Sequence, residues 1–294
     1  MPELPEVETM KRGLTPILGC TIESVTFPKC RLRPIGVEPS RSTLRRRVTG
    51  QVVSRLGRIG KRVVVELENR HSLIFEPRMT GIVLVADPPN WTHLRLAFSL
   101  SGGDVDTLMY WDRRGLGSVK CLSPAEISER YGPDRLGPDA LDCTGESFRS
   151  RLGQSRREIK VALLDQRAVA GIGNLYAAEI LHRCGIHPQQ RCDELSKRQW
   201  ESIAENTRFV LEEAIRYEGS TLSDGTYRNA LNESGSYQNA HRVYDREGQP
   251  CPSCGRKTIA RIVQAQRSTF FCAQCQKLKK KARANSARKK PRSH

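Results

Sequence analysis

The sequence lacks any apolar run long enough to cross a membrane, and its first residues are charged, unlike those of a signal peptide. These absences argue against a membrane-embedded protein, and we expect a soluble protein of the cytoplasm with no membrane partner. Acidic residues are absent from positions 277 to 294, where nine residues are Lys or Arg. Such a segment is too polar and too charged to fold alone, so we predict a disordered basic tail at 278–294.

Negative charge is scarce in the rest of the chain as well. The 49 Lys and Arg outnumber the 32 Asp and Glu, which gives a net charge of +17, and removing the nine charges of positions 277–294 leaves 17 − 9 = +8. A soluble protein with this excess usually has a polyanion as its partner. The tail either attracts phosphates without sequence preference or only aids solubility, and the composition leaves both open.

A dinucleotide-binding fingerprint is also missing. The segment Val169-Ala170-Gly171-Ile172-Gly173-Asn174 lacks a third glycine at the required offset, and no strand is expected before it. Two glycines and an Asn before a helix allow backbone amides to converge on a phosphate. A plain tight turn between packed helices is an equally good interpretation.

Cysteines are plentiful, but their spacing does not suggest disulfides. Cys251 and Cys254 form one C-x2-C pair, Cys272 and Cys275 form a second, and seventeen residues separate the pairs. This pattern predicts a tetrahedral thiolate site for one structural Zn²⁺. The other six are expected to be small buried residues in a reducing compartment: Cys20, Cys30, Cys121, Cys143, Cys184 and Cys192.

The first 122 residues predict one helix followed by short strands. Pro5 and the acids after it are typical of a first helical turn, and Val7, Met10, Leu14 and Ile17 lie on one apolar face. Seven short apolar runs follow and favour a β-sandwich: 21–27, 62–66, 72–75, 81–85, 94–100, 107–111 and 117–122. Two basic, glycine-containing loops are expected at 55–62 and 111–117.

The second half predicts helices and then a hairpin. Positions 123–142 are rich in Pro, Gly, Asp and Ser and are expected to form a linker. Helices are expected at 144–152, 159–166, 175–184 and 195–217. The polar, Gly- and Ser-rich segment 219–240 is typical of a mobile functional loop. In the cysteine-rich module, 259–266 and 268–271 can pair as a hairpin with Arg267 at its tip.

The start of the chain offers an unusual nucleophile. If Met1 is removed, which the small Pro2 favours, the terminus becomes a secondary amine beside the carboxylate of Glu3. Attack of such an amine on a sugar C1′ gives an iminium ion that is an electron sink as soon as it forms. The alternative is that Pro2 only precedes a helix, as most N-terminal prolines do.

Several separate motifs together make the chain resemble the formamidopyrimidine-DNA glycosylase family, which combines a helix-two-turn-helix domain with a C-terminal zinc finger. They are MPELPEVET at the start, GRIGKRVVVEL, RMTG, DRRGLG, IKVALLDQRAVAGIGNLYAAEILHRCGIHP, VYDREGQPCPSCG and AQRSTFFCAQCQK. The resemblance covers essentially residues 1 to 277.

The resemblance implies an α+β multidomain fold. It divides the chain into an N-terminal catalytic helix-plus-β-sandwich domain at 1–122, a linker at 123–142, a helix-two-turn-helix DNA-binding domain with a lesion-capping loop at 143–240, a four-cysteine zinc-finger β-hairpin at 241–277 and the basic tail at 278–294.

It also implies the catalytic roles. Pro2 would displace the damaged base and form the Schiff base, and Glu3 would be the proton donor at the sugar. Lys61 would assist β-elimination, and Arg267 would contact phosphate and assist δ-elimination. Phosphate contacts are implied for Lys160 and Asn174, and further backbone contacts for His93 and Arg156.

Three residues are the candidates to fill the gap that an extruded base leaves: Met79, Arg114 and Leu116. Leu116 replaces the usual Phe and would stack less well on a base. Arg78 stands where a Gly usually precedes the Met, and Gly115 replaces an Arg. The preference for the opposite base is therefore open.

The function implied is that of a monomeric base-excision repair enzyme: a bifunctional DNA glycosylase and AP lyase that removes 8-oxoguanine and formamidopyrimidines from duplex DNA by β,δ-elimination. Its partner would be double-stranded DNA with an oxidised base or an abasic site. One alternative is an oxidised-pyrimidine glycosylase of the endonuclease VIII branch. A second is a non-catalytic DNA damage-binding protein.

Overall fold

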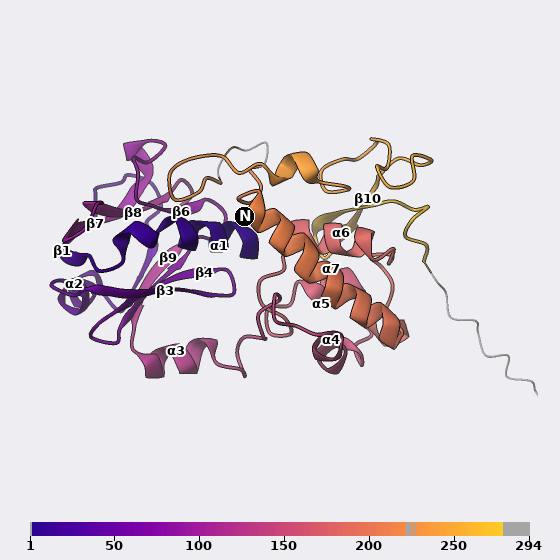
Figure 1. Cartoon of the computed structure of the whole chain (residues 1–294), viewed down its shortest axis with the longest axis horizontal. Coiled ribbons are helices and arrows are strands. Elements are labelled where there is room, and N and C mark those ends of the chain that lie inside the picture. The colour runs from indigo at the N-terminus through magenta and orange to yellow at the C-terminus, as the bar shows by residue number, and fades with distance from the viewer. Residues whose placement is uncertain (1, 222–224, 226, 279–294) are drawn as a thin grey trace, which may run out of the picture.

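The computed structural model describes residues 2–221, 225 and 227–278, and these residues form two lobes (Figure 1). Strands fill one lobe and helices with a β-hairpin fill the other, and the N-terminus lies between them. None of the helices in the described part of the chain is both long enough and apolar enough to span a membrane.

The strand lobe is a sandwich of two sheets, as the sequence predicts. The four-stranded sheet is antiparallel and has the order β1 (Thr21–Thr26), β7 (Leu94–Ser101), β8 (Thr107–Asp112) and β6 (Gly81–Leu84). The five-stranded sheet has the order β2 (Gly36–Glu38), β9 (Ser118–Leu122), β5 (Ser72–Glu76), β4 (Arg62–Leu67) and β3 (Val53–Ile59). Only the β2 and β9 pair is parallel within these two sheets.

The seven predicted strands are present, but two further strands and a helix were missed. The segment 55–62, expected as a loop, is strand β3 as far as Ile59, and only Gly60 and Lys61 form the turn. Because β3 is an edge strand, it can expose charged residues such as Arg55, which hides the strand pattern. The missed helix α2 (Arg41–Val48) is so rich in Arg that it shows only two buried positions.

The predicted linker at 123–142 contains helix α3 (Pro124–Tyr131), which corrects the expectation of a plain connection. Ser123 accepts a hydrogen bond from the amide of Glu126, whose side chain in turn accepts from the amide of Ser123. Ile127 and Tyr131 pack on the outer face of the five-stranded sheet. The capping signal was present, but the surrounding Pro and Gly residues obscured it.

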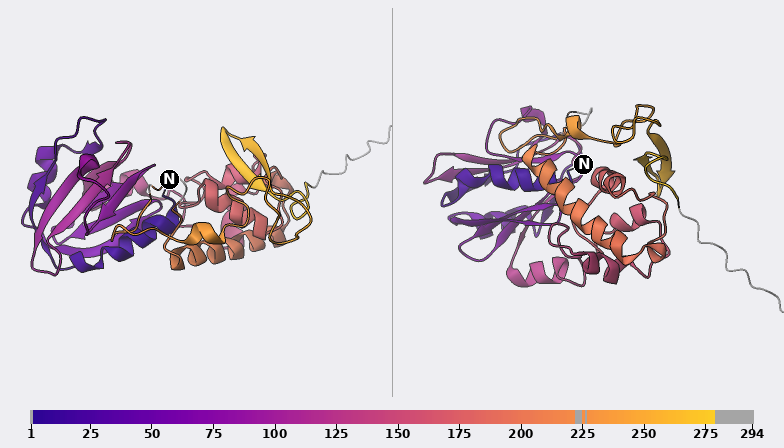
Figure 2. Two further views of the ribbon diagram at one scale, coloured as in Figure 1. Left: turned by 90° about the horizontal axis from the view of Figure 1, so that it is seen from above. Right: turned by 45° about the vertical axis from the view of Figure 1, so that its right-hand side comes forward.

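The second lobe has four predicted helices: α4 (Gly145–Leu152), α5 (Ile159–Leu163), α6 (Asn174–Arg183) and α7 (Lys197–Arg216). They enclose a core centred on Trp200, Tyr176 and Phe148. The hairpin is β10 (Ala260–Gln264) and β11 (Arg267–Phe271), and Figure 2 shows it on the side of this lobe away from α7. Short 3₁₀ turns are η1 (Thr15–Ile17), η2 (Trp91–His93), η3 (Cys192–Glu194) and η4 (Tyr237–Ala240).

Helix α1 (Leu4–Gly13) contributes to the cores of both lobes. Its predicted apolar face, including Val7 and Met10, is fully buried in the core of the strand lobe. Leu4, at the start of the helix, is instead part of the core of the helical lobe. The first residues of the chain are therefore held at the junction of the two lobes.

One largely buried guanidinium also joins the lobes. Arg58 on β3 donates from Nε to Glu8 of α1 at 3.1 Å and from both terminal nitrogens to Asp139 at 2.5 and 3.1 Å. Its Nη1 also donates to the carbonyl of Gly60 at 2.9 Å, directly before Lys61. A bidentate Arg with a partner on each side is well suited to a rigid connection.

The pKa of Glu8 makes this connection testable. Burial raises that pKa, but hydrogen bonds and charges from Lys11, Arg58 and Arg12 outweigh burial and lower it to about 2 from 4.5. A carboxyl group whose pKa is lower in the folded than in the unfolded state stabilises the fold at any pH above its unfolded pKa. This stabilisation is lost as the pH falls towards the folded pKa. We expect Glu8→Gln to lower the free energy of unfolding at pH 7 by about 3 kcal/mol.

The difference between wild type and Glu8→Gln should shrink as the pH falls from about 4.5 to about 2, as measured by urea unfolding at several pH values. Glu146→Gln is a matched control, because Glu146 forms only an exposed pair with Arg149 at 3.4 Å. An unchanged difference between about pH 7 and about pH 2.5 would contradict the assignment.

Candidate active site

Glu3 lies at the N-terminus of helix α6. Its carboxylate accepts hydrogen bonds from the backbone amides of Leu175 at 3.0 Å and Tyr176 at 3.4 Å, and its side chain is almost fully buried. The amide of Leu4 donates to the carbonyl of Gly171 at 3.1 Å. The residues that follow Pro2 are therefore bound to the loop that precedes Asn174.

This arrangement explains the two glycines of the 169–174 segment. A Cβ on Gly173 would lie 2.2–2.6 Å from the carboxylate of Glu3, and a Cβ on Gly171 would lie 2.4 Å from the side chain of Leu4. Gly171 also has a φ of +108°. The amides at the start of α6 bind an internal carboxylate, so of the two interpretations of this segment neither the phosphate cradle nor the plain turn describes it.

Glu6 is a buried acid that the sequence analysis treated only as part of a helical turn. It accepts hydrogen bonds from the amide of Glu3 at 2.8 Å, the hydroxyl of Tyr176 at 2.5 Å and the amide of Ser220 at 2.9 Å. Burial and the charge of Glu3 raise the pKa of Glu6. The spacing of the two acids is that of a capping box, a signal that could have identified Glu6 as a support for the terminus.

Lys61, on the turn between β3 and β4, lies in the same electrostatic environment as Glu3 and Arg267. Burial lowers its pKa, Glu3 opposes this effect, and the charges of Arg267 and Arg62 add to the lowering. A lowered pKa increases the neutral fraction of the amine, which is the form that can accept a proton. Arg267 itself is exposed and follows the hairpin turn Ala265–Gln266, so it is the first residue of β11 and lies beside the tip.

Lys160 is fully buried, which differs from the direct phosphate contact expected of it. Its Nζ donates to Asn174 Oδ1 and Thr269 Oγ1, both at 2.6 Å, and to the carbonyl of Ser268 at 3.2 Å. Burial lowers the pKa of Lys160 to about 8. All three donor positions are used, so this lysine links Asn174 to the hairpin.

The loops of Met79 and Arg114 share one buried anchor, Asp112, at the end of β8. Its Oδ1 accepts from the hydroxyl of Thr80 and from the amide of Arg114 at 3.1 Å, while its Oδ2 accepts from the amide of Gly117 at 2.8 Å. Met79 and Leu116 are half-buried and Arg114 is exposed. The three proposed gap-filling residues therefore extend from one framework.

Two departures from the family pattern lie at backbone positions that favour glycine. Arg78 has a φ of +55°, a conformation that favours glycine, and its Nε forms an ion pair with Glu76 at 2.8 Å. Gly115 has a φ of +61°, and a Cβ there would lie 2.0 Å from the carbonyl oxygen of Arg33. The loop 113–117 in this conformation accepts no side chain at position 115.

The remaining predicted backbone contacts lie apart from this framework in the sequence. His93 is half-buried, its ring packs edge-on against Trp111, and burial together with nearby Arg95 and Arg113 lowers its pKa. Arg156 is exposed on the loop before α5.

The predicted capping loop is only partly covered by the described residues, because residues 222–224 and 226 lie outside them. Tyr227, expected as part of the segment that closes over a base, is buried in the core of the strand lobe. Its hydroxyl donates to the carbonyl of Glu218 at 2.9 Å. The ring therefore anchors the end of the loop.

The four cysteines of the C-terminal module come together as predicted. Their Sγ atoms all lie within 4.8 Å of one another, with Cys251 and Cys275 at 3.9 Å and Cys254 and Cys272 at 3.7 Å. Zinc–sulfur bonds of about 2.3 Å in a tetrahedron separate the sulfurs by about 3.8 Å. The four thiolates therefore fit one structural zinc ion.

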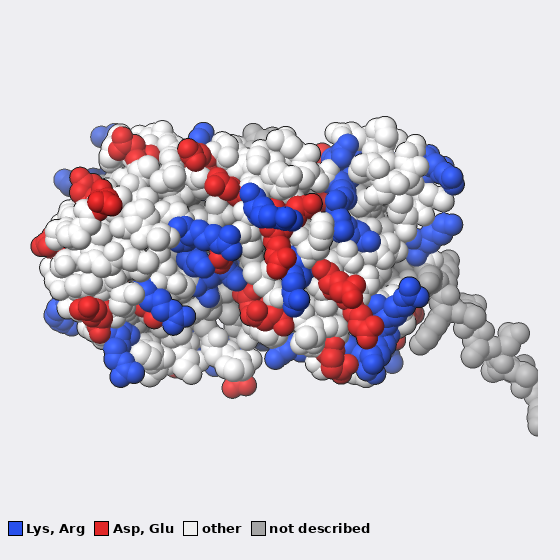
Figure 3. Space-filling model, in the orientation of Figure 1, with Lys and Arg blue, Asp and Glu red and all other residues white. Residues whose placement is uncertain are grey.

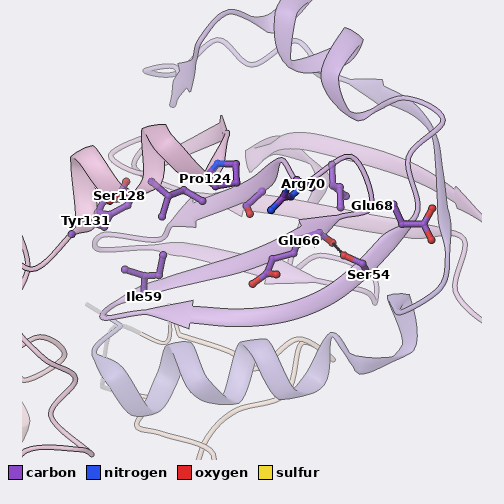
Figure 4. A pocket seen from close by; sticks show the side chains of 12 residues that line it. Ser54, Ile59, Glu66, Glu68, Arg70, Pro124, Ser128 and Tyr131 are labelled. Carbon is purple, nitrogen blue, oxygen red and sulfur yellow. Dashed lines mark hydrogen bonds between the residues drawn. The ribbon is translucent and has the colours of Figure 1, made fainter.

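Two surface features lie outside this site. A groove of about 780 Å³ runs between α3 and the five-stranded sheet and includes Ile59, Glu66, Arg70 and Tyr131 (Figure 4), but none of the predicted site residues lines it. Lys and Arg are mixed with Asp and Glu over the face that carries α7 (Figure 3). This face is not the uniformly basic surface that a polyanion favours.

Three family models match the chain. The formamidopyrimidine-DNA glycosylase N-terminal domain matches residues 1–119, the H2TH domain of the same family matches 136–226, and a zinc finger found in FPG and IleRS matches 248–278.

Proteins named formamidopyrimidine-DNA glycosylase are similar over nearly the full length. The one from Bacillus subtilis is 36% identical and that from Chloroflexus aurantiacus 38% identical, each over 94% of this chain and 99% or 98% of the relative. The crystal structure of the MutM (Fpg) protein from Thermus thermophilus is 35% identical, with a TM-score of 0.81 over 95% of this chain and 100% of that one. A Lactococcus lactis Fpg mutant in complex with Fapy-dG DNA is 32% identical, with a TM-score of 0.82 over 94% and 100% of the two chains. With its terminal Pro-Glu held at the lobe junction and its four-cysteine module in place, the chain belongs to the formamidopyrimidine-DNA glycosylase family.

Proposed function

We propose that this protein is a bifunctional DNA glycosylase and AP lyase that removes 8-oxoguanine and formamidopyrimidines from duplex DNA in the cytoplasm. The observation that carries the proposal is the position of Pro2 and Glu3 at the junction of the lobes, in the electrostatic environment of Lys61 and Arg267. Solved relatives contain DNA with Fapy-dG, an abasic site or carbocyclic 8-oxo-G, which supports this class of substrate.

The chemistry begins at Pro2. After removal of Met1, its secondary amine attacks C1′ of the damaged nucleotide and the base leaves. Protonation of O4′ then opens the sugar ring by breaking the C1′–O4′ bond, and the resulting iminium ion activates the C2′ proton. Glu3 is held beside the nucleophile by α6 and donates the proton at the sugar. Glu6 binds the amide that directly follows Pro2 and keeps the terminus in place.

The cations complete the site. Neutral Lys61 accepts a proton during β-elimination, which its lowered pKa favours. Arg267 binds the phosphate and assists δ-elimination, and Asn174 binds a flanking phosphate. Lys160 acts indirectly, by holding Asn174 and the hairpin in register. Arg156 and His93 contribute further contacts to the DNA backbone.

Base extrusion uses Met79, Arg114 and Leu116, which fill the gap left in the duplex. Leu116 separates base pairs but offers no aromatic face, so its contact with the base opposite the lesion is weaker than that of the usual Phe. The framework of Asp112 sets the relative position of the two loops.

The endonuclease VIII alternative is less favoured, because the similar relatives are named for formamidopyrimidine and solved relatives contain oxidised purines. The non-catalytic alternative is less favoured because a pure binding protein needs none of Pro2, Glu3, Lys61 and Arg267 as a set. Cleavage assays on a panel of duplexes with different lesions separate the three functions. Cleavage at thymine glycol but not at 8-oxoguanine would indicate the endonuclease VIII alternative, and binding without cleavage would indicate the non-catalytic alternative.

Borohydride trapping tests the nucleophile. On an 8-oxoguanine·C duplex we expect a covalent adduct whose peptide, identified by mass spectrometry, begins at Pro2. A variant with Gly-Ser added before Pro2 is the control, because the nitrogen of Pro2 then lies in a peptide bond and is not a free amine. It should bind the duplex without forming the adduct. An adduct on an internal lysine would contradict the proposed nucleophile.

Asp112→Asn tests the framework of the gap-filling loops. In the variant, the amide N–H of asparagine faces groups that donate hydrogen bonds to the carboxylate of Asp112 in the wild type. We therefore expect lesion binding to weaken by about 1–3 kcal/mol. The ratio of affinities for lesion and undamaged duplex, measured by fluorescence anisotropy, should fall. Asp87→Asn is the control on an exposed residue of the same lobe. An unchanged ratio would argue against a role in lesion recognition.

Zinc removal tests the independence of the C-terminal module. Its small core is separate from that of the strand lobe, so chelation should release the hairpin and abolish DNA binding while the sandwich stays folded. Circular dichroism and thermal unfolding of the chelated protein would check this. Loss of the whole fold together with the metal would show that the module stabilises both lobes.

A further inference from the structure

Helix α6 forms one wall of the zinc module. The carboxylate of Glu179 accepts hydrogen bonds from the backbone amides of three successive residues, Arg242, Val243 and Tyr244, at 2.9, 3.0 and 2.8 Å. These bonds fix the chain where it enters the module. Ala178, the preceding residue, belongs to the apolar core of the module. The helix that begins at Asn174 therefore packs directly against the module that holds the metal site.

His182 lies one turn further along the same helix and contacts a zinc ligand. Its side chain is buried, with a relative exposure of 4%, and Nε2 is 3.5 Å from Sγ of Cys251. Nδ1 is also buried and has no hydrogen-bond partner among the residues that the structure describes. The imidazole is thus directed at the metal site through one nitrogen only.

The protonation of the two partners follows from the chemistry of the site. Cysteine binds zinc as a thiolate, which carries no proton and can only accept a hydrogen bond. The contact is attractive only if Nε2 carries the hydrogen, which leaves Nδ1 as the bare nitrogen. His182 is not one of the four residues whose ligand atoms lie within 4.8 Å of one another, so its place is outside the ligand set.

We propose that His182 is a positioning residue that donates an N–H···S hydrogen bond from Nε2 to the Cys251 thiolate. Zinc with four thiolates has a net charge of about −2, and a donor to sulfur disperses part of it. Arg183 and Arg242 line the same hollow as His182 and Cys275 and add positive charge beside the centre. The bond joins the metal site to the helix that starts at Asn174, and so joins the hairpin of Arg267 to the helical lobe.

The tautomer can be measured without any substitution. In the full-length zinc-loaded protein labelled with ¹⁵N, the side-chain resonances of His182 should show Nε2 as the protonated nitrogen and Nδ1 as the unprotonated one. An unprotonated Nε2 would overturn the proposal. The measurement does not depend on DNA cleavage, so its outcome is independent of the proposed enzymatic function.

Two variants separate the donor from the volume of the ring. His182→Gln can place an amide N–H near the position of Nε2, whereas His182→Leu fills space without a donor. In competition with a zinc chelator, we expect His182→Leu to lose roughly 10–100-fold in zinc affinity and His182→Gln to stay closer to wild type. In the cobalt-substituted protein, the sulfur-to-cobalt charge-transfer band should shift for His182→Leu.

His241→Leu is the matched control, since His241 is as deeply buried but its Nε2 bonds to Ser220 Oγ at 3.0 Å. It should keep the zinc affinity and cobalt spectrum of wild type. Equal zinc loss in His182→Gln and His182→Leu would show that packing is what matters, and wild-type behaviour of His182→Leu would show that the contact contributes nothing. Either result would overturn the proposal.

Discussion

The structure depends on helix α1, whose residues belong to the hydrophobic cores of both lobes. Its first apolar residue, Leu4, packs in the helical lobe, while the following turns pack in the sandwich. A chain terminus is normally free to fray, because few contacts hold it. Here the terminus cannot move without disturbing two cores, and the carboxylates of Glu3 and Glu6 add hydrogen bonds to the helical lobe. Pro2, the proposed nucleophile, is thereby held in a fixed position.

The same requirement for rigidity recurs around the site. Arg58 connects α1, the turn of Lys61 and Asp139 through one guanidinium, and Lys160 connects Asn174 with the hairpin. Lys160 is fully buried with all three donor positions used, and Arg58 is largely buried with bonds from all three of its nitrogens, which is costly unless the partners are in place. Such networks suit a site in which reactive groups come from distant parts of the chain. Removing one partner would leave the others unpaired.

Buried polar anchors have a second effect, because they leave exposed side chains free for the proposed contacts with DNA. Asp112 and Thr80 bind each other and the backbone amides of the 113–117 loop, and Arg114 and Arg267 remain exposed. Glycines allow the close approaches that this needs, most clearly Gly173 against Glu3. Positions where a side chain stands in a left-handed conformation, such as Arg78, show where the loop geometry is kept against local preference.

The sequence alone determined the residues with chemical character and the local elements that carry them. The Pro-Glu terminus, the two C-x2-C pairs and the amphipathic helices are local patterns, and each was recognisable because its residues lie within a few positions of one another. Strand β3 and helix α3 were missed because edge exposure and neighbouring Pro and Gly weaken the local pattern.

Only the tertiary structure decided what each residue contacts. Burial of Lys160, the carboxylate of Glu3 at the start of α6, the buried ring of Tyr227 and the contact of His182 with Cys251 all join segments far apart in the chain. No periodicity or spacing encodes such pairs, because they arise when separate elements pack together. The order of the residues in the sequence indicated the chemical character of each side chain, and the packing of the two lobes determined which partner each side chain contacts.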